Sequence, residues 1–230
     1  MALIRPGGLL GGLSGGIGGI VGSRNGAGDY IRARTKPTVS TTPYAMNQKA
    51  LFAVASQSWQ GLTAAQRQAW NEWAPQQTTF NRIGQAITQK GHVMYAGIYC
   101  RMVAAGLSPL TVPPIAPAPA PLSSIDFTAD IGAGDFEITY APATLPANTR
   151  IYYQACVNNS PAINYVENYL RFIGTSSSAA ASPQDPQTLI EARFGTLVVG
   201  QYVTIMASTF STVTGLISRP VRADAAVVTT

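Results

Sequence analysis

The sequence has few charged residues. Only 11% of its 230 residues are Asp, Glu, Lys or Arg, against a usual share of about 25%. A freely diffusing monomer normally needs surface charge to stay in solution. Low charge combined with an ordinary hydrophobic content, here 46%, is therefore typical of a protein that packs against copies of itself, and also of secreted β-proteins.

Histidine and cysteine are scarce, which excludes several kinds of site. His92 is the only histidine, and Cys100 and Cys156 are the only cysteines. One histidine and two distant cysteines do not provide the ligands of a usual zinc site, and they do not indicate a disulfide framework. No Gly-x-Ser-x-Gly motif accompanies His92, so a Ser-His-Asp triad is not indicated. We expect a protein that is not an enzyme.

Two further patterns were considered as ligand sites. The carboxylates of Asp126, Asp130, Asp135 and Glu137 lie close in sequence but lack the spacing of an EF-hand, and we interpret them as solvated charges of turns and edge strands. Gly-x-Gly patterns occur near the N-terminus without the Lys-Ser/Thr of a phosphate loop and without a strand-helix context. We expect no metal ion, no cofactor and no small-molecule substrate.

The net charge of +5 is unevenly distributed. Residues 1–123 contain ten Lys or Arg and two acids (+8), whereas residues 124–230 contain five Arg and eight acids (−3). The two halves could attract each other head to tail between subunits, or the basic half could face an anionic partner. Chance variation on two surfaces explains the asymmetry about equally well.

Glycine is concentrated near the N-terminus, where it makes up nine of the sixteen residues 7–22. Glycine loses the most backbone freedom on folding and buries no side chain. We therefore predict that residues 1–41 form an extended assembly arm, ordered by the rest of the chain or by neighbouring subunits. The alternatives are a membrane-active helix and a cleaved export signal, although the apolar run is shorter than the roughly twenty residues that span a bilayer.

The arm continues into a basic segment at residues 30–34. Its alternation predicts a short strand with Tyr30, Arg32 and Arg34 on one face. We predict that these residues contact other subunits, by adding a strand to a neighbouring sheet. A weak contact with nucleic acid is the rival, because a basic arm with an aromatic residue can lie along phosphates; the segment contains no known DNA-reading motif.

Residues 42–112 are predicted to form a small helical domain. Thr42-Pro43 is a favourable helix start, and Gly61 should end this first helix. Its apolar stripe is expected to consist of Leu51, Phe52, Val54, Ala55 and Trp59.

Two further helices are expected in the same domain. Thr63 and Gln66 form a capping box that opens a second helix ending at Pro75, and a third helix is expected over residues 88–106. Trp59, Trp70 and Trp73 on these helices can close a small core, and we also predict that Trp70 contacts another subunit.

The remainder of the chain is predicted to be a linker and an all-β domain. Residues 113–123 alternate Pro with Ala, which predicts a stiff spacer of about 3 Å per residue and a domain boundary. Residues 124–230 should form the second domain. Its expected strands cover residues 125–129, 136–140, 150–157, 165–173, 188–192, 202–208 and 216–222. Such a number of strands is typical of an immunoglobulin-like or fibronectin-like β-sandwich.

Two parts of the sequence resemble known families. Leu197, Gly200 and Tyr202, followed by alternating apolar residues, resemble the fibronectin type III pattern, and residues 211–215 resemble the last hairpin of that fold. Residues 9–114 resemble uncharacterised structural proteins encoded by bacteriophages and prophages. Four elements support this second resemblance: the Gly-rich segment 13–25 with the basic strand after it, the Trp-x2-Leu-Thr-x2-Gln-Arg-x-Ala-Trp element at 59–70, residues 81–85, and residues 105–107 before the prolines.

The phage resemblance implies a structural gene product and carries over no activity and no site residues. Taken with the composition, it predicts an α+β multidomain protein of a bacteriophage virion, associated with the capsid or the tail. Its partners would be copies of itself and other virion proteins. The alternative is a secreted or cell-surface adhesin or filament subunit whose sandwich binds glycan or protein.

Overall fold

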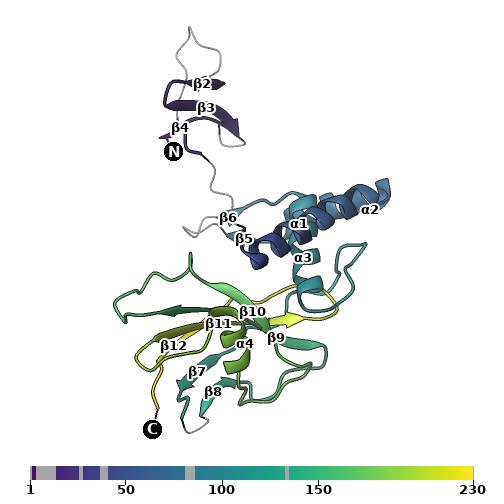
Figure 1. Cartoon of the computed structure of the whole chain (residues 1–230). Helices are drawn as coiled ribbons and strands as arrows, with labels where there is room; N and C mark the ends of the chain where they lie inside the picture. Colours follow the sequence, from purple (N-terminus) through teal and green to yellow (C-terminus); the bar gives the residue numbers. More distant parts are fainter. Residues whose placement is uncertain are drawn as a thin grey trace. The chain divides into compact units, whose positions relative to one another are not determined.

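The computed structural model describes residues 2–3, 14–25, 28–36, 41–80, 86–132 and 135–229. Its contacts divide the chain into two compact units, Met1–Gln48 and Lys49–Thr230, which are described separately. The chain combines α-helices with antiparallel sheets (Figure 1). The predicted α+β class is therefore confirmed.

The first unit contains a four-stranded sheet in the order β1-β4-β3-β2. The strands are β1 Ala2–Leu3, β2 Gly15–Ile17, β3 Ile20–Asn25 and β4 Gly28–Ala33. Ile17 pairs with Ile20 across a two-residue Gly-Gly turn in which Gly18 has φ +56°, a conformation that glycine adopts without strain. The predicted extended arm is wrong for these residues, because the glycines close a hairpin.

The predicted basic strand is present as β4, and Arg34 follows it. β4 lies between two strands, since Tyr30 pairs with Ser23 of β3 and with Leu3 of β1. The N–H of Arg34 donates to the carbonyl of Gly19 over 2.8 Å. Because Tyr30 and Ile31 are paired on both sides within the chain, the prediction that this segment adds a strand to a neighbouring sheet is wrong for these two residues and stays a prediction for residues 32–34. The edges of this sheet are β1 and β2.

The predicted helices are present with small shifts at their ends. They are α1 Pro43–Gly61, α2 Ala64–Trp73 with the 3-10 turn η1 Ala74–Gln76, and α3 Gly91–Ala104. The capping box of α2 is formed, since the Gln66 N–H donates to the Thr63 hydroxyl and the Thr63 N–H donates to the Gln66 side chain. The short strands β5 Thr79–Phe80 and β6 Ala86–Ile87 pair before α3. Residues 81–85 lie outside the described residues.

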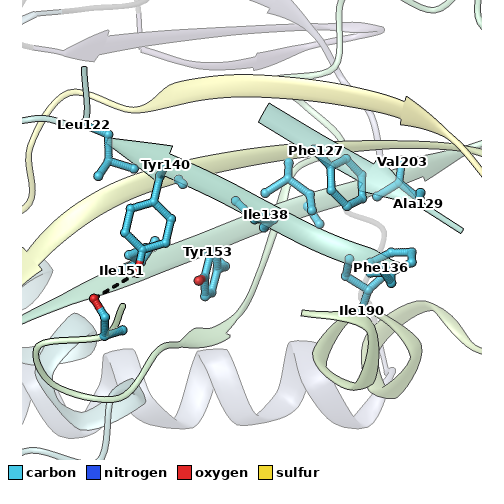
Figure 2. Packing of buried hydrophobic residues seen from close by; sticks show 14 of the residues in the cluster. Leu122, Phe127, Ala129, Phe136, Ile138, Tyr140, Ile151, Tyr153, Ile190 and Val203 are labelled. Carbon is cyan, nitrogen blue, oxygen red and sulfur yellow. Dashed lines mark hydrogen bonds between the residues drawn. The ribbon is translucent and has the colours of Figure 1, made fainter. Parts of the chain in front are cut away.

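The second unit contains two antiparallel sheets around one core. β9 Thr149–Asn158, β10 Arg171–Thr175, β11 Tyr202–Ser211 and β12 Val221–Ala226 form a sheet in the order β10-β9-β11-β12, and β7 Ser124–Ala129 pairs with β8 Phe136–Ala141. Phe136 and Ile138 from β8 pack in the same cluster as Ile151 and Val203 from the larger sheet (Figure 2). The phenol of Tyr140 donates to the carbonyl of Ala180 over 3.0 Å (Figure 2).

One predicted strand, over residues 188–192, is a helix. α4 spans Gln187–Phe194. The Asp185 carboxylate accepts the Gln187 N–H over 2.7 Å, and Gly195 ends the helix with φ +90°. A short apolar run does not separate strand from helix by its periodicity, so the Asp-Pro start and the terminal glycine were the better signals.

The predicted boundary at residues 113–123 is not where the contacts divide the chain. Trp70 and Tyr95 from the helices share a hydrophobic cluster with Phe210 and Leu216 from the β region. The hydroxyl of Thr209 donates to the carbonyl of Ala120 over 2.6 Å. The Pro/Ala segment therefore lies against the β region and does not act as a spacer that holds two domains apart.

The contact between α3 and the β region depends on a glycine. Gly215 has φ +67°, and a Cβ there would lie 2.7 Å from Ile98 and 2.9 Å from Met102. We expect Gly215→Ala to lower the free energy of unfolding by about 3 kcal/mol through backbone strain and overpacking, measured by urea denaturation. Gly61→Ala is the control, since Gly61 has open space around its Cβ position; an equal loss in both variants would contradict this account.

Among the described residues, the buried hydroxyl of Tyr153 has no hydrogen-bond partner, and burial raises the pKa of this phenol. An unpaired buried hydroxyl carries a desolvation cost. We expect Tyr153→Phe to raise the free energy of unfolding by about 1 kcal/mol. Tyr140→Phe, which removes a paired hydroxyl, should lower it in the same denaturation assay. A loss of stability in Tyr153→Phe would show that its hydroxyl has a partner.

Candidate functional site

Trp70, predicted from the sequence to contact another subunit, is buried within its own chain. Its side chain is 0% exposed, and its ring makes edge-to-face contacts with Trp73 at 5.5 Å and Tyr95 at 5.4 Å. Its Nε1–H donates to the carbonyl of Thr111 over 3.2 Å. The predicted contact role is wrong, because the ring is the centre of the aromatic core.

The other three predicted contact residues lie in the N-terminal sheet. Arg32 and Arg34 are exposed and Tyr30 is half-buried. Tyr30 and Arg32 are two residues apart in β4, so they share a face of the sheet. Their exposure is compatible with a contact to an anionic group, and the role itself stays a prediction.

The residues considered for chemistry lie on several elements: His92 and Cys100 on α3, Cys156 on β9, and the four acids on or beside β7 and β8. His92 is exposed in α3, with its ring 6.3 Å from that of Trp59, and Cys100 and Cys156 are free thiols. The Asp126 and Asp130 carboxylates accept backbone N–H groups of Phe127 and Gly132. Within the described ranges, no group of three or more His, Cys, Asp or Glu side chains is arranged to hold a metal ion.

A groove of about 570 Å³ lies between α1 and α3, and we call it the helix groove. Ten residues line it: Phe52, Ala55, Ser56, Trp59 and Gln60 on α1, and His92, Val93, Ala96, Gly97 and Cys100 on α3. Its walls are mostly apolar, and one polar group is already paired, since the Ser56 hydroxyl donates to the carbonyl of Phe52. Burial raises the pKa of the Cys100 thiol.

Of the apolar stripe predicted for α1, Phe52, Ala55 and Trp59 line this groove, whereas Leu51 and Val54 do not. Phe52 is 60% exposed and Val54 is 47% exposed, while Ala55 is buried. The expected inward stripe is therefore wrong for Phe52 and Val54. Exposed apolar side chains that line one groove commonly mark an interaction surface. None of the described helices is long and apolar enough to cross a membrane.

A second exposed surface is the connection between β9 and β10, residues 161–170, which we call the aromatic loop. Sequence analysis placed a strand over part of it, but these residues form a turn in which the N–H groups of Tyr169 and Leu170 donate to the carbonyl of Val166. Val166 is fully buried, whereas Tyr165 and Tyr169 are each 57% exposed and Ile163 is also exposed. The buried Val166 side chain thus anchors the loop, and the side chains of Ile163, Tyr165 and Tyr169 are exposed to solvent.

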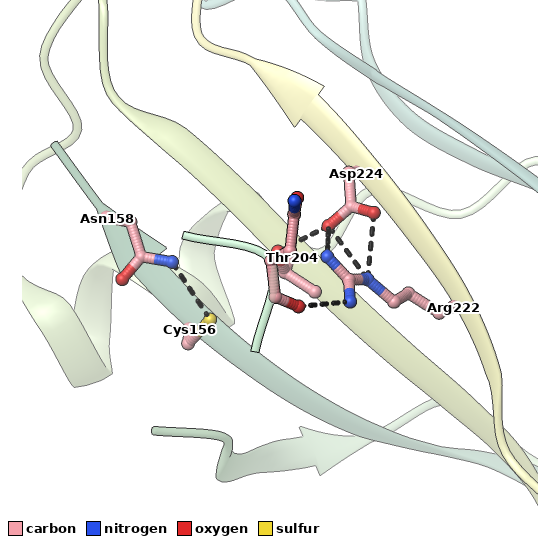
Figure 3. Close-up of polar contacts among 6 residues, drawn as sticks. Cys156, Asn158, Thr204, Arg222 and Asp224 are labelled. Atoms are coloured by element: carbon pink, nitrogen blue, oxygen red, sulfur yellow. Dashed lines mark hydrogen bonds and ion pairs between the residues drawn. The ribbon is translucent and has the colours of Figure 1, made fainter. Parts of the chain in front are cut away.

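A polar cluster contacts the aromatic loop through Arg222 (Figure 3). Arg222 donates from Nη1 to the carbonyl of Asn164 over 2.9 Å, and its Nε lies 2.8 Å from the Asp224 carboxylate. Asp224 also accepts a hydrogen bond from the Thr204 hydroxyl. The hydrogen bond between Arg222 and Asp224 raises the pKa of the Arg222 guanidinium. A pocket of about 260 Å³ lies between these residues and the start of the loop.

Sequence analysis did not single out the helix groove or the aromatic loop. The loop carried a usable signal, since residues 161–170 contain five large apolar or aromatic residues and a single charged one, Glu167. No family model, curated protein or solved structure matches the chain.

The hydrogen bond from Arg222 to Asn164 should slow local opening of the aromatic loop. We expect Arg222→Leu to speed hydrogen exchange at the Tyr169 and Leu170 amides by about fivefold, the factor that corresponds to a hydrogen bond of about 1 kcal/mol. Mass-spectrometric hydrogen exchange would measure it. Arg219→Leu removes the same charge from an exposed side chain and should leave these amides unchanged; equal effects would show that charge alone, and not the contact, is responsible.

Proposed function

We propose that this chain is a non-enzymatic structural subunit of a bacteriophage virion, associated with the capsid or the tail. The observation that carries the proposal is that one compact unit leaves two ordered apolar surfaces exposed, the helix groove and the aromatic loop. Surfaces of this kind are usual where a protein binds another protein. The low charge of the chain and the resemblance of residues 9–114 to phage-encoded structural proteins support the virion setting.

The N-terminal sheet offers a further means of assembly. β2 is an edge strand and Ile17 in it is 78% exposed. An edge strand can pair with a strand of another chain, and many weak contacts in one particle reinforce one another. In this proposal Tyr30, Arg32 and Arg34 contact carboxylates of neighbouring proteins, and a contact of Arg32 and Arg34 with nucleic acid is secondary.

We also propose that residues 124–230 form a divergent fibronectin-like β-sandwich. Two sheets enclose one core, Leu197 is buried, and Tyr202 begins β11 after a turn in which Gly200 has φ +91°. These features match the pattern for which the resemblance was noted. α4 stands where the sequence predicted a strand.

The proposal predicts that the chain is a component of phage particles. Particles purified by density gradient from a producing culture and washed in high salt should contain its peptides in amounts comparable to other structural proteins, as measured by quantitative mass spectrometry. The control is purified protein mixed with particles of an unrelated phage, which should not sediment with them. Peptides found only on cells or in the medium, and not in particles, would contradict the proposal and favour the adhesin or filament alternative.

A further inference from the structure

We propose that the pocket beside Arg222 and Asp224 binds one ring of a neutral saccharide, and we call it the sheet pocket. Its volume of about 260 Å³ lies just below the roughly 300 Å³ at which sites for drug-sized ligands begin, which suits a single ring. Saccharide binding goes beyond the proposed function, since it would serve a virion subunit and a cell-surface protein alike. Four features support it: the floor of the pocket, its apolar wall, its fixed polar groups and the charge around it.

The floor of the sheet pocket is the outer face of the larger sheet. Tyr202 and Thr204 flank Val203, which lies in the core, so both point away from the core. Tyr202 pairs with Asn158 of β9, and Thr204 pairs with Asp224 of β12. Because the backbone of β11 is paired on both sides, this floor offers no free strand edge to a peptide, and a ligand on it is held by side chains.

The start of the aromatic loop gives the pocket an apolar wall. Ile163 lines the pocket and is 43% exposed, and the half-buried Tyr202 lies on the floor beside it. A pyranose ring has a face made of C–H groups, which packs on aromatic and aliphatic side chains as other apolar surface does. The pocket therefore offers one surface to the face of the ring and polar groups to its hydroxyls.

The polar side chains are held in place before a ligand arrives (Figure 3). Arg222 donates from Nε to Oδ2 of Asp224 over 2.8 Å and from Nη2 to Oδ1 over 3.0 Å. Its Nη1 donates to the carbonyl of Asn164, and the Thr204 hydroxyl donates to Asp224. Groups that are already fixed lose little entropy when a ligand binds.

Arg222 and Asp224 retain capacity for a ligand. Among the described residues, the bonds of Arg222 use three of its five guanidinium N–H groups. Within the same part of the chain, Arg222 is the only donor to Asp224 Oδ2, and the Asp224 side chain is 49% exposed. A hydroxyl group both donates and accepts, so one sugar hydroxyl can donate to Oδ2 while its neighbour accepts from the guanidinium.

The charge around the pocket favours an uncharged ligand. Arg222 and Asp224 form an ion pair. Arg171 donates to two carbonyls of the aromatic loop, and the hydrogen bond to Asp224 and, less strongly, the loop acid Glu167 raise the pKa of Arg222. Two positive and two negative side chains thus balance, which leaves no net attraction for a carboxylate or a phosphate.

Titrations followed by NMR would test the site with four uncharged probes, the methyl pyranosides of glucose, galactose, mannose and N-acetylglucosamine. We expect at least one to shift the side-chain amide signals of Asn158 and Asn164 in a saturable way, with a dissociation constant of about 1 mM, as for a ligand of this size. No saturable shift with any of the four at about 50 mM, far above that constant, would overturn the proposal. Tighter binding of glucuronate or of trialanine than of every probe would overturn the neutral saccharide.

Two variants test whether binding occurs in the sheet pocket. Ala226 pairs with Tyr202 and lines the pocket, so Ala226→Phe should fill it and abolish binding. Asp224→Asn keeps the shape of the side chain and removes the charged acceptor, and it should weaken binding at least about tenfold. Ala147→Phe makes the first change at an exposed position before β9 and should leave the dissociation constant within about twofold. Undiminished binding in Ala226→Phe would overturn the site.

Hydrogen exchange shows whether Asp224→Asn acts on the ligand or on the loop. Exchange at the Tyr169 and Leu170 amides should match that of the unmodified protein, because the loop stays in place. Unchanged binding in Asp224→Asn would overturn the Asp224 contact. If the loop opens faster, Ala226→Phe, which keeps the ion pair, supports the site by losing binding or overturns it by retaining binding.

The outcome is separable from that of the particle experiment. A particle component that binds none of the four probes leaves the virion function standing and overturns the saccharide site. A chain that binds a probe in the sheet pocket and is absent from particles supports the saccharide site and overturns the virion function.

Discussion

The close approach of α3 to the β region at Gly215 is the contact on which the second unit depends. Arg101 in α3 donates to the Gly215 carbonyl over 3.1 Å, and Ile98 and Met102 occupy the space that a side chain at position 215 would need. Phe210 and Leu216 then join the aromatic cluster around Trp70. Because this one cluster takes side chains from helices and strands, the two parts of residues 49–230 are held as one unit.

The same packing explains which apolar side chains of α1 and α3 are left out of the hydrophobic core. α3 turns Tyr95 and Met102 inward, so its opposite side, with Val93 and Cys100, faces α1 across the helix groove. α1 contributes Ala55 as a buried residue but leaves Phe52 exposed. A helix with apolar residues on more than one side cannot bury all of them in a small core, and the remainder forms a surface that a partner can cover.

Sequence patterns predicted the structure reliably where that structure depends on residues close together in the chain. The Thr63–Gln66 capping box, the start of α1 at Pro43 and the strands of the core were predictable, because each depends on neighbouring residues or on simple alternation. The glycine hairpin and α4 were missed although Gly-Gly turns and an Asp-Pro start are local signals too. In both segments the overall composition favours a different structure from the one that the turn residues indicate.

The sequence alone determined the α+β class, the positions of α1, α2 and α3, those of β4, β7, β8, β9 and β11, and the uneven charge, since these follow from residue order. Only the tertiary structure decided that Trp70 is a core residue, that residues 113–123 are not a spacer, and that Tyr165 and Tyr169 stand on an anchored loop. Burial of a side chain depends on contacts between residues far apart in the chain, such as Trp70 with Thr111 and Arg222 with Asn164. Periodicity within one segment carries no information about such partners.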